Sequence, residues 1–191
     1  DSSHLLVVGA GRIAHLLPDA FRTVLPIGRV TIWARQIDRA QALAARLSDE
    51  GFDAHAAQSL ERAVQQADVV SCATLSTAPL VHGRWLRAGT HLDLIGSFKP
   101  SMREADDDCF KGAAIYVDTD EALGKSGDLI EPMSRGVFGV ADVRGTLSTL
   151  SRSQATGRMT AQARTVFKGV GSALEDLAAA MLVHSHSSMA H

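Results

Sequence analysis

The chain has 191 residues, enough for one α/β domain with a substantial core. Its formal net charge of −2 comes from acidic and basic residues mixed along the sequence, so neither a nucleic acid nor a membrane partner is indicated. Its two cysteines make no disulfide framework or zinc motif, and no apolar run is long enough to span a bilayer. We therefore expect a reduced, cytoplasmic setting and no metal site.

A strand that runs into a glycine-rich turn opens the sequence. The apolar run 5–8 is typical of a strand buried on both faces of a parallel sheet. Gly9, Gly11 and Ala14 then fit the G-x-G-x-x-G/A fingerprint of dinucleotide binding. The first glycine permits a tight turn, the second lets a pyrophosphate approach the backbone, and the alanine lets the helix pack closely. The same residues also suit a tight strand-to-helix turn that binds no ligand.

The residue after the second predicted strand indicates the type of cofactor. Rossmann units that bind NAD usually carry an acidic residue here, which holds the adenosine ribose. This chain has Arg35 instead, and Arg39 follows one helical turn later. Because a guanidinium forms charge-assisted bidentate bonds with phosphate, the sequence favours NADP over NAD. The alternative is a solvated arginine that only begins a helix.

Apolar periodicity predicts alternating helices and strands along the chain. After the first strand we expect helices at 11–25, 37–47, 59–67, 104–110, 120–125 and 171–184, strands at 29–34, 52–57, 68–74, 90–95 and 113–118, and an extended segment at 164–167. Pro18 lies inside the first helix, and Ser59 is the predicted cap of the third. Glycines and prolines interrupt the pattern at 126–163. The alternation predicts right-handed βαβ units, and hence an α/β fold: a Rossmann-type, doubly wound parallel sheet with helices on both faces.

Small and polar residues follow the fourth and fifth predicted strands. In an open α/β sheet, ligands bind outside the carboxyl ends of the strands, where the strand order reverses. Thr74, Ser76 and Thr77 are therefore placed to contact a ribose or nicotinamide, and Gly96 permits close backbone approach. Serine and threonine are also ordinary loop residues. The histidines of the tail 184–187 have no carboxylate partner, so we expect a solvated chain end there.

Several motifs together resemble the ornithine cyclodeaminase/μ-crystallin family. The matching segments are VVGAGRIA (7–14), VTIWAR (30–35), ADVVSCATLSTAPLV (67–81), GTHLDLIGSFKPSMREAD (89–106), YVDTDEAL (116–123), SGDL (126–129) and TVFKGVGSALEDLAAAMLV (165–183). The resemblance implies an NAD(P)-binding domain over residues 1–168. It also implies that 169–191 is a C-terminal helix that returns to a substrate and dimerisation domain. By the same resemblance we expect the N-terminal part of that domain to be missing from this sequence, which would explain the abrupt start at Asp1.

The resemblance also implies which residues contact the cofactor. The residues that contact the pyrophosphate are Gly9, Gly11, Arg12, Ile13 and Ala14, and those near the adenosine ribose or its phosphate are Ala34, Arg35 and Arg39. The residues beside the nicotinamide riboside are Ala73, Thr74 and Thr77. The residues near the nicotinamide ring are Gly96, Ser97, Gly169 and Val170. The family's lysine and arginine, which grip the substrate carboxylate and assist proton transfer, lie in the absent segment. No catalytic residue is therefore assigned within this chain.

One departure from the family pattern bears on the reaction. Cyclodeaminases of the family have an aspartate after the fifth strand, thought to be the base in ornithine cyclisation, whereas this chain has Phe98. A phenyl ring accepts no proton, so we expect an NAD(P)H-dependent reductase of a cyclic imino acid such as Δ1-pyrroline-2-carboxylate. The resemblance also implies that the full-length protein is a homodimer. The alternatives are an ornithine cyclodeaminase, an alanine dehydrogenase, and a non-enzymatic μ-crystallin-like protein that binds NADPH and a small ligand.

Overall fold

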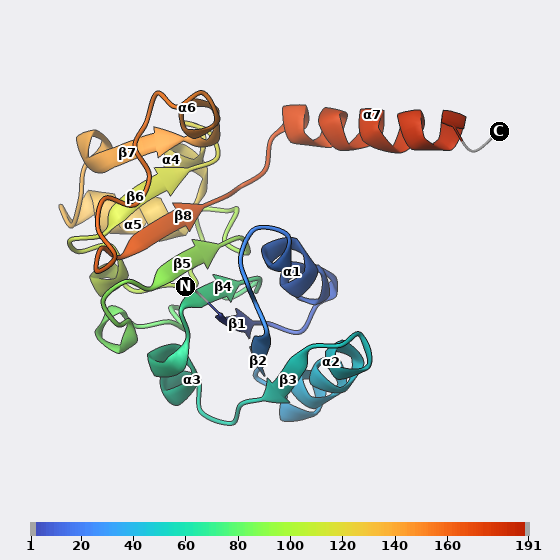
Figure 1. Ribbon diagram of the computed structural model, residues 1–191. Helices are drawn as coiled ribbons and strands as arrows, with labels where there is room; N and C mark the ends of the chain where they lie inside the picture. The colour runs from blue at the N-terminus through green and yellow to red at the C-terminus, as the bar shows by residue number, and fades with distance from the viewer. Residues whose placement is uncertain (1–2, 190–191) are drawn as a thin grey trace.

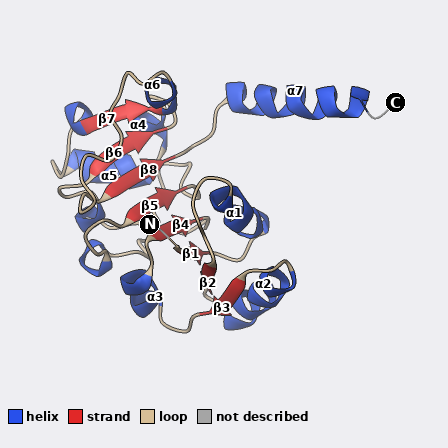
Figure 2. Cartoon of the chain, viewed as in Figure 1, coloured by secondary structure: helices blue, strands red, loops and turns tan. Residues whose placement is uncertain are grey.

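A computed structural model describes residues 3–189, and its centre is one parallel sheet of eight strands (Figures 1 and 2). The strand order is β3-β2-β1-β4-β5-β8-β6-β7. The strands are β1 (His4–Val8), β2 (Arg29–Trp33), β3 (Asp53–Ala56), β4 (Val69–Cys72), β5 (His91–Leu94), β6 (Ala114–Val117), β7 (Val143–Thr146) and β8 (Thr165–Lys168). The chain moves outward from β1 to β3 and then returns to place β4 on the other side of β1. This reversal confirms the doubly wound α/β fold.

Helices cover both faces of the sheet. They are α1 (Arg12–Arg22), α2 (Ile37–Asp49), α3 (Leu60–Gln66), α4 (Ala122–Lys125), α5 (Gly127–Ser134), α6 (Leu147–Ser151) and α7 (Ala173–Met189), with 3-10 turns η1 (Gly83–Trp85), η2 (Asp107–Cys109) and η3 (Val140–Asp142). Leu5 and Val7 pack beneath α1 and α2, whereas Leu6 and Val8 join the cluster that contains α3. Alternate residues of one strand point to opposite faces, so the apolar run of β1 supplies both halves of the core.

The predicted strands are all present, and most begin or end one or two residues inside the predicted bounds. Strand β1 instead begins one residue earlier than predicted, and the extended segment predicted at 164–167 is a strand at 165–168. Helix α1 continues through Pro18 to Arg22. The predicted cap of α3 is confirmed, because the Ser59 hydroxyl accepts a hydrogen bond from Arg62 N at 3.3 Å. Cys72 is fully buried in the core.

The helix predicted over 104–110 is wrong. Ala105 instead forms an isolated parallel bridge with Val81, and only the short turn η2 follows. The Glu104 carbonyl accepts hydrogen bonds from Leu80 N and Val81 N, both at 2.9 Å, so the backbone here pairs with a distant segment. The segment 126–163, for which the pattern predicted no element, contains α5, η3, β7 and α6.

The last helix, α7, extends away from the sheet (Figure 1). Its apolar side chains Leu174, Leu177 and Met181 are exposed, as are His184 and His186. The sequence predicted a solvated end at 184–187; the side chain of Ser187 lies outside the described residues. Packing of α7 against a further domain stays a prediction. Within residues 3–189, every helix is too short or too polar to cross a membrane.

Candidate functional site

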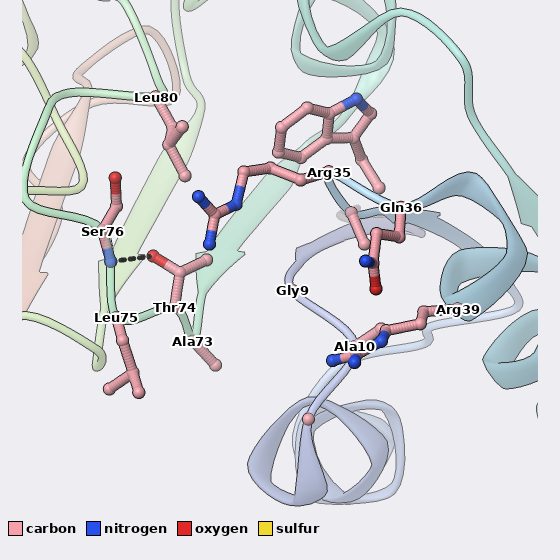
Figure 3. Close-up of a pocket in the computed structure, with 13 residues that line it drawn as sticks. Gly9, Ala10, Arg35, Gln36, Arg39, Ala73, Thr74, Leu75, Ser76 and Leu80 are labelled. Carbon is pink, nitrogen blue, oxygen red and sulfur yellow. Dashed lines mark hydrogen bonds between the residues drawn. The ribbon is translucent and has the colours of Figure 1, made fainter.

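A cavity of about 670 Å³ lies at the carboxyl ends of β1, β2 and β4, where the strand order reverses (Figure 3). Eight of the residues predicted to contact a cofactor line it: Gly9, Gly11, Ala34, Arg35, Arg39, Ala73, Thr74 and Ser76. They come from three separate stretches of sequence, each of which follows a strand of the same sheet. Parallel strands end at one edge, so the fold itself brings these stretches together.

The glycine turn forms the floor of this cavity. Gly9 has φ of +123°, which L side chains rarely adopt, and its N–H donates to the Trp33 carbonyl at 2.8 Å. A Cβ on Gly9 would lie 2.7 Å from the Ala73 carbonyl oxygen, so only glycine fits. A Cβ on Gly11, by contrast, would meet no protein atom within 4 Å. The Gly11 backbone is thus open to a ligand, while Ala14 is fully buried against the sheet.

Two helices without side-chain caps begin at the cavity. Helix α1 follows Gly11, and α2 follows Gln36, whose side chain makes no capping bond. Helices α3 and α5, which begin elsewhere, are capped by the hydroxyls of Ser59 and Ser126. Free N–H groups and the positive end of the helix dipole attract anions. The two uncapped ends are therefore suited to two phosphate groups.

Two arginines add positive charge to the same space. In Figure 3 the Arg35 guanidinium extends across the cavity toward Thr74, whereas Arg39 lies beside Ala10 of the glycine turn. Arg39 also borders a second groove of about 700 Å³, which Arg12 and Arg46 line as well. These cationic side chains and the two helix ends can bind more than one anionic group of a ligand.

The wall opposite Arg35 is held by a carboxylate that the sequence did not indicate. Glu104 Oε1 accepts hydrogen bonds from Thr74 N and Thr74 Oγ1, both at 2.7 Å. Ser76 N in turn donates to Thr74 Oγ1 at 3.3 Å (Figure 3). Glu104 is fully buried; burial raises its pKa, and the bonds from Thr74 oppose that shift.

The remaining predicted residues lie outside this cavity. Arg12, Ile13 and Thr77 are exposed near its rim, and Gly169 and Val170 follow β8 at the same edge of the sheet. Gly96 and Ser97 are buried beneath Thr74. The Ser97 hydroxyl donates to the Met102 carbonyl at 2.6 Å. Within residues 3–189, no group of three or more His, Cys, Asp or Glu side chains is placed to hold a metal ion.

The sheet order and the glycine turn define an α/β domain of the Rossmann type. The chain belongs to the ornithine cyclodeaminase/mu-crystallin family, whose model matches residues 1–190. It is 46% identical over 179 residues to the Delta(1)-pyrroline-2-carboxylate reductase of Paracoccus denitrificans, an alignment that covers 93% of this chain and 57% of that enzyme.

Two solved structures are also similar. One is the Thermococcus litoralis Delta(1)-pyrroline-2-carboxylate reductase in complex with NADH and L-proline (TM-score 0.89, 30% identity, 92% of this chain and 55% of that chain). The other is an archaeal alanine dehydrogenase dimer with bound NAD (TM-score 0.92, 31% identity, 99% of this chain and 58% of that chain). The chain thus spans a little over half the length of these relatives.

Proposed function

We propose that this protein is an NAD(P)H-dependent reductase of a cyclic imino acid of the Δ1-pyrroline-2-carboxylate type. The observation that carries the proposal is the cavity at the β1–β4 reversal, with two uncapped helix ends and two arginines facing it. The identity with the Paracoccus reductase supports the choice of substrate class. A bound nicotinamide would supply the hydride that reduces the imine carbon.

Each side of the cavity has its own part in this proposal. The amides that follow Gly9 and Gly11 bind the pyrophosphate at the start of α1. Arg35 and Arg39 bind the adenosine end, and their charge favours the 2′-phosphate of NADPH. Thr74 and the loop after β5 orient the nicotinamide riboside. Holding the ring against the imine carbon removes much of the entropic barrier to hydride transfer.

The loop after β5 supports reduction over cyclodeamination. Phe98 in this loop is 43% exposed at the carboxyl edge of the sheet, and its phenyl ring has no group that accepts a proton. A cationic imine needs only positioning, exclusion of water and a partner for its carboxylate before hydride arrives. We expect the groups that bind the substrate carboxylate to lie in a part of the full-length protein outside these 191 residues.

The proposal is tested by supplying the full-length protein with Δ1-pyrroline-2-carboxylate and either NADPH or NADH. We expect loss of reduced-nicotinamide absorbance and formation of proline. Parallel reactions contain NAD with ornithine, and NADH with pyruvate and ammonia. Proline and ammonia from ornithine would establish a cyclodeaminase instead, and alanine from pyruvate would establish an alanine dehydrogenase. Tight NADPH binding without turnover of any cyclic imine would favour a binding protein.

A further inference from the structure

Glu104 joins the two loops that lie on the predicted nicotinamide side of the cavity. One carboxylate oxygen, Oε1, accepts from the amide and hydroxyl of Thr74 in the loop after β4. The other, Oε2, accepts from Gly96 N at 2.8 Å and Ser97 N at 3.2 Å in the loop after β5. Both oxygens act only as acceptors, as they do in an ionised carboxylate. One buried side chain therefore sets the separation of two loops.

The two loops are also in direct contact at Gly96. A Cβ on Gly96 would lie 1.9 Å from the Thr74 carbonyl oxygen and 2.4 Å from Glu104 Oε1. Nothing larger than a hydrogen atom fits between these groups. The position of Thr74 in the cavity wall thus depends on both the carboxylate and the glycine.

Glu104 is itself held from below. Its amide and the amide of Ala105 both donate to Asp128 Oδ1, at 2.9 and 3.1 Å. Asp128 Oδ2 has no hydrogen-bond partner within the described residues and faces Lys168 Nζ at 3.9 Å. Lys168, fully buried in β8, donates to the Leu94 carbonyl at 2.9 Å. Its positive charge offsets part of the cost of burying the two carboxylates.

We propose that Glu104 is a positioning residue, which aligns the nicotinamide riboside by fixing the loops after β4 and β5, and that Asp128 and Lys168 hold Glu104 in place. This inference rests on the proposed binding of a nicotinamide dinucleotide. Thr74 lines the cavity, and Phe98 is exposed on the loop after β5. The Glu104 carboxylate therefore joins a loop that lines the proposed cofactor cavity to a loop that is exposed at the carboxyl edge of the sheet. A displacement of about 1 Å at a reacting centre costs up to ~100-fold in rate.

The test is Glu104→Gln in the full-length protein. Glutamine has the same shape, but its NH2 group cannot accept from a backbone N–H, so the loop that faces this group loses one or two of its hydrogen bonds. Two ligands are titrated: NADPH, and 2′,5′-ADP, which lacks the nicotinamide half. We expect NADPH affinity to fall about 10-fold and kcat to fall up to ~100-fold. The affinity for 2′,5′-ADP and the KM for the imine are expected to stay unchanged. NADH and ADP-ribose replace this pair if NADH binds more tightly.

The matched control is Asp106→Asn. Asp106 lies two residues away and also accepts backbone N–H groups, from Gly83 at 2.8 Å and Cys109 at 3.2 Å. Its side chain bonds His82 at the far end of the segment after β4, at 2.8 Å, but it bonds none of Thr74, Gly96 and Ser97. We expect it to lower stability without changing the ratio of the two affinities. Thr74→Val, which removes one bond to Glu104, is expected to act in the same direction as Glu104→Gln, and Thr74→Ser to restore the affinity.

Three results would overturn the inference. The first is that Glu104→Gln weakens the binding of NADPH and of 2′,5′-ADP equally. The second is that this variant keeps the NADPH affinity and kcat of the unchanged protein. The third is that the unchanged protein binds no dinucleotide. If Glu104→Gln does not fold, Thr74→Val decides: an unchanged ratio of the two affinities then overturns the inference. Because the ratio is measured by binding alone, it still tests the inference if no imine is reduced.

Discussion

Cofactor preference is decided at the level of single side chains, and here Arg35 and Arg39 occupy different parts of the cavity. Arg35 extends toward the β4 loop, whereas Arg39 lies beside the glycine turn (Figure 3). In the proposed binding mode, both guanidinium groups lie on the side of the cavity that takes the adenosine ribose, next to a pyrophosphate at α1. Among residues 3–189, no acidic side chain lines the cavity to bind the ribose hydroxyls of NAD.

We expect Arg35→Asp to weaken NADPH binding about 10- to 100-fold and NADH binding much less, since hydrogen bonds to a charged phosphate are lost. Titration of both cofactors measures the ratio of their affinities. Arg29→Asp, at the opposite end of β2, makes the same charge change outside the cavity and is expected to alter neither. Equal effects of Arg35→Asp on the two cofactors would contradict the role given to Arg35.

The buried carboxyl of Asp93 makes stability depend on pH. Burial raises its pKa to about 6, against the opposing effects of the Ser71 hydroxyl and Lys168. The folded protein then holds this proton at pH values where the unfolded chain has released it. Its contribution to stability is therefore present near pH 4 and is lost as pH rises through about 6.

In the unchanged protein we expect the free energy of unfolding to fall as pH rises from about 5 to about 7. In Asp93→Asn we expect this fall to be smaller by about 1 kcal/mol. Denaturant unfolding at the two pH values measures it. A variant that keeps the full pH dependence of the unchanged protein would show that other groups produce it.

At the level of the elements, the strands and the glycine turn were predictable because their signals are local. An apolar run such as 5–8 is enough to indicate a strand buried on both faces. The role of Glu104 was not predictable, because its partner Thr74 is 30 residues away and the segment 104–110 has a helical composition. Strand β7 was missed since it is an edge strand, only half buried and interrupted by Gly145.

The glycine turn allows binding to be separated from folding. We expect Gly11→Ala to leave the melting temperature nearly unchanged, because its Cβ meets no protein atom, and to weaken dinucleotide binding at least ~10-fold by blocking the pyrophosphate. Gly28→Ala, which also has open space, is the control and is expected to leave binding unchanged. Calorimetry of unfolding and of ligand binding measures both quantities. Undiminished binding by Gly11→Ala would place the pyrophosphate elsewhere.

At the level of the whole molecule, α7 and the sheet form separate parts. We expect a chain that ends at Gly171 to retain cooperative unfolding and the cavity, because α7 leaves the sheet after β8 and its apolar side chains are exposed (Figure 1). Circular dichroism during denaturation and titration with 2′,5′-ADP check this expectation. A truncated chain that fails to fold would show that α7 is part of the domain's core.

The position of β8 has a consequence for how the chain matures. This strand is the last of the eight along the sequence, yet it lies between β5 and β6. On the ribosome, β6 and β7 therefore have no edge to join until residues 165–168 have emerged. The same four residues deliver Lys168, which faces the carboxylate beneath Glu104. A nascent chain that ended before that point would lack both a continuous sheet and the lysine beneath the cavity wall, so this wall is completed only after residues 165–168 have been synthesised.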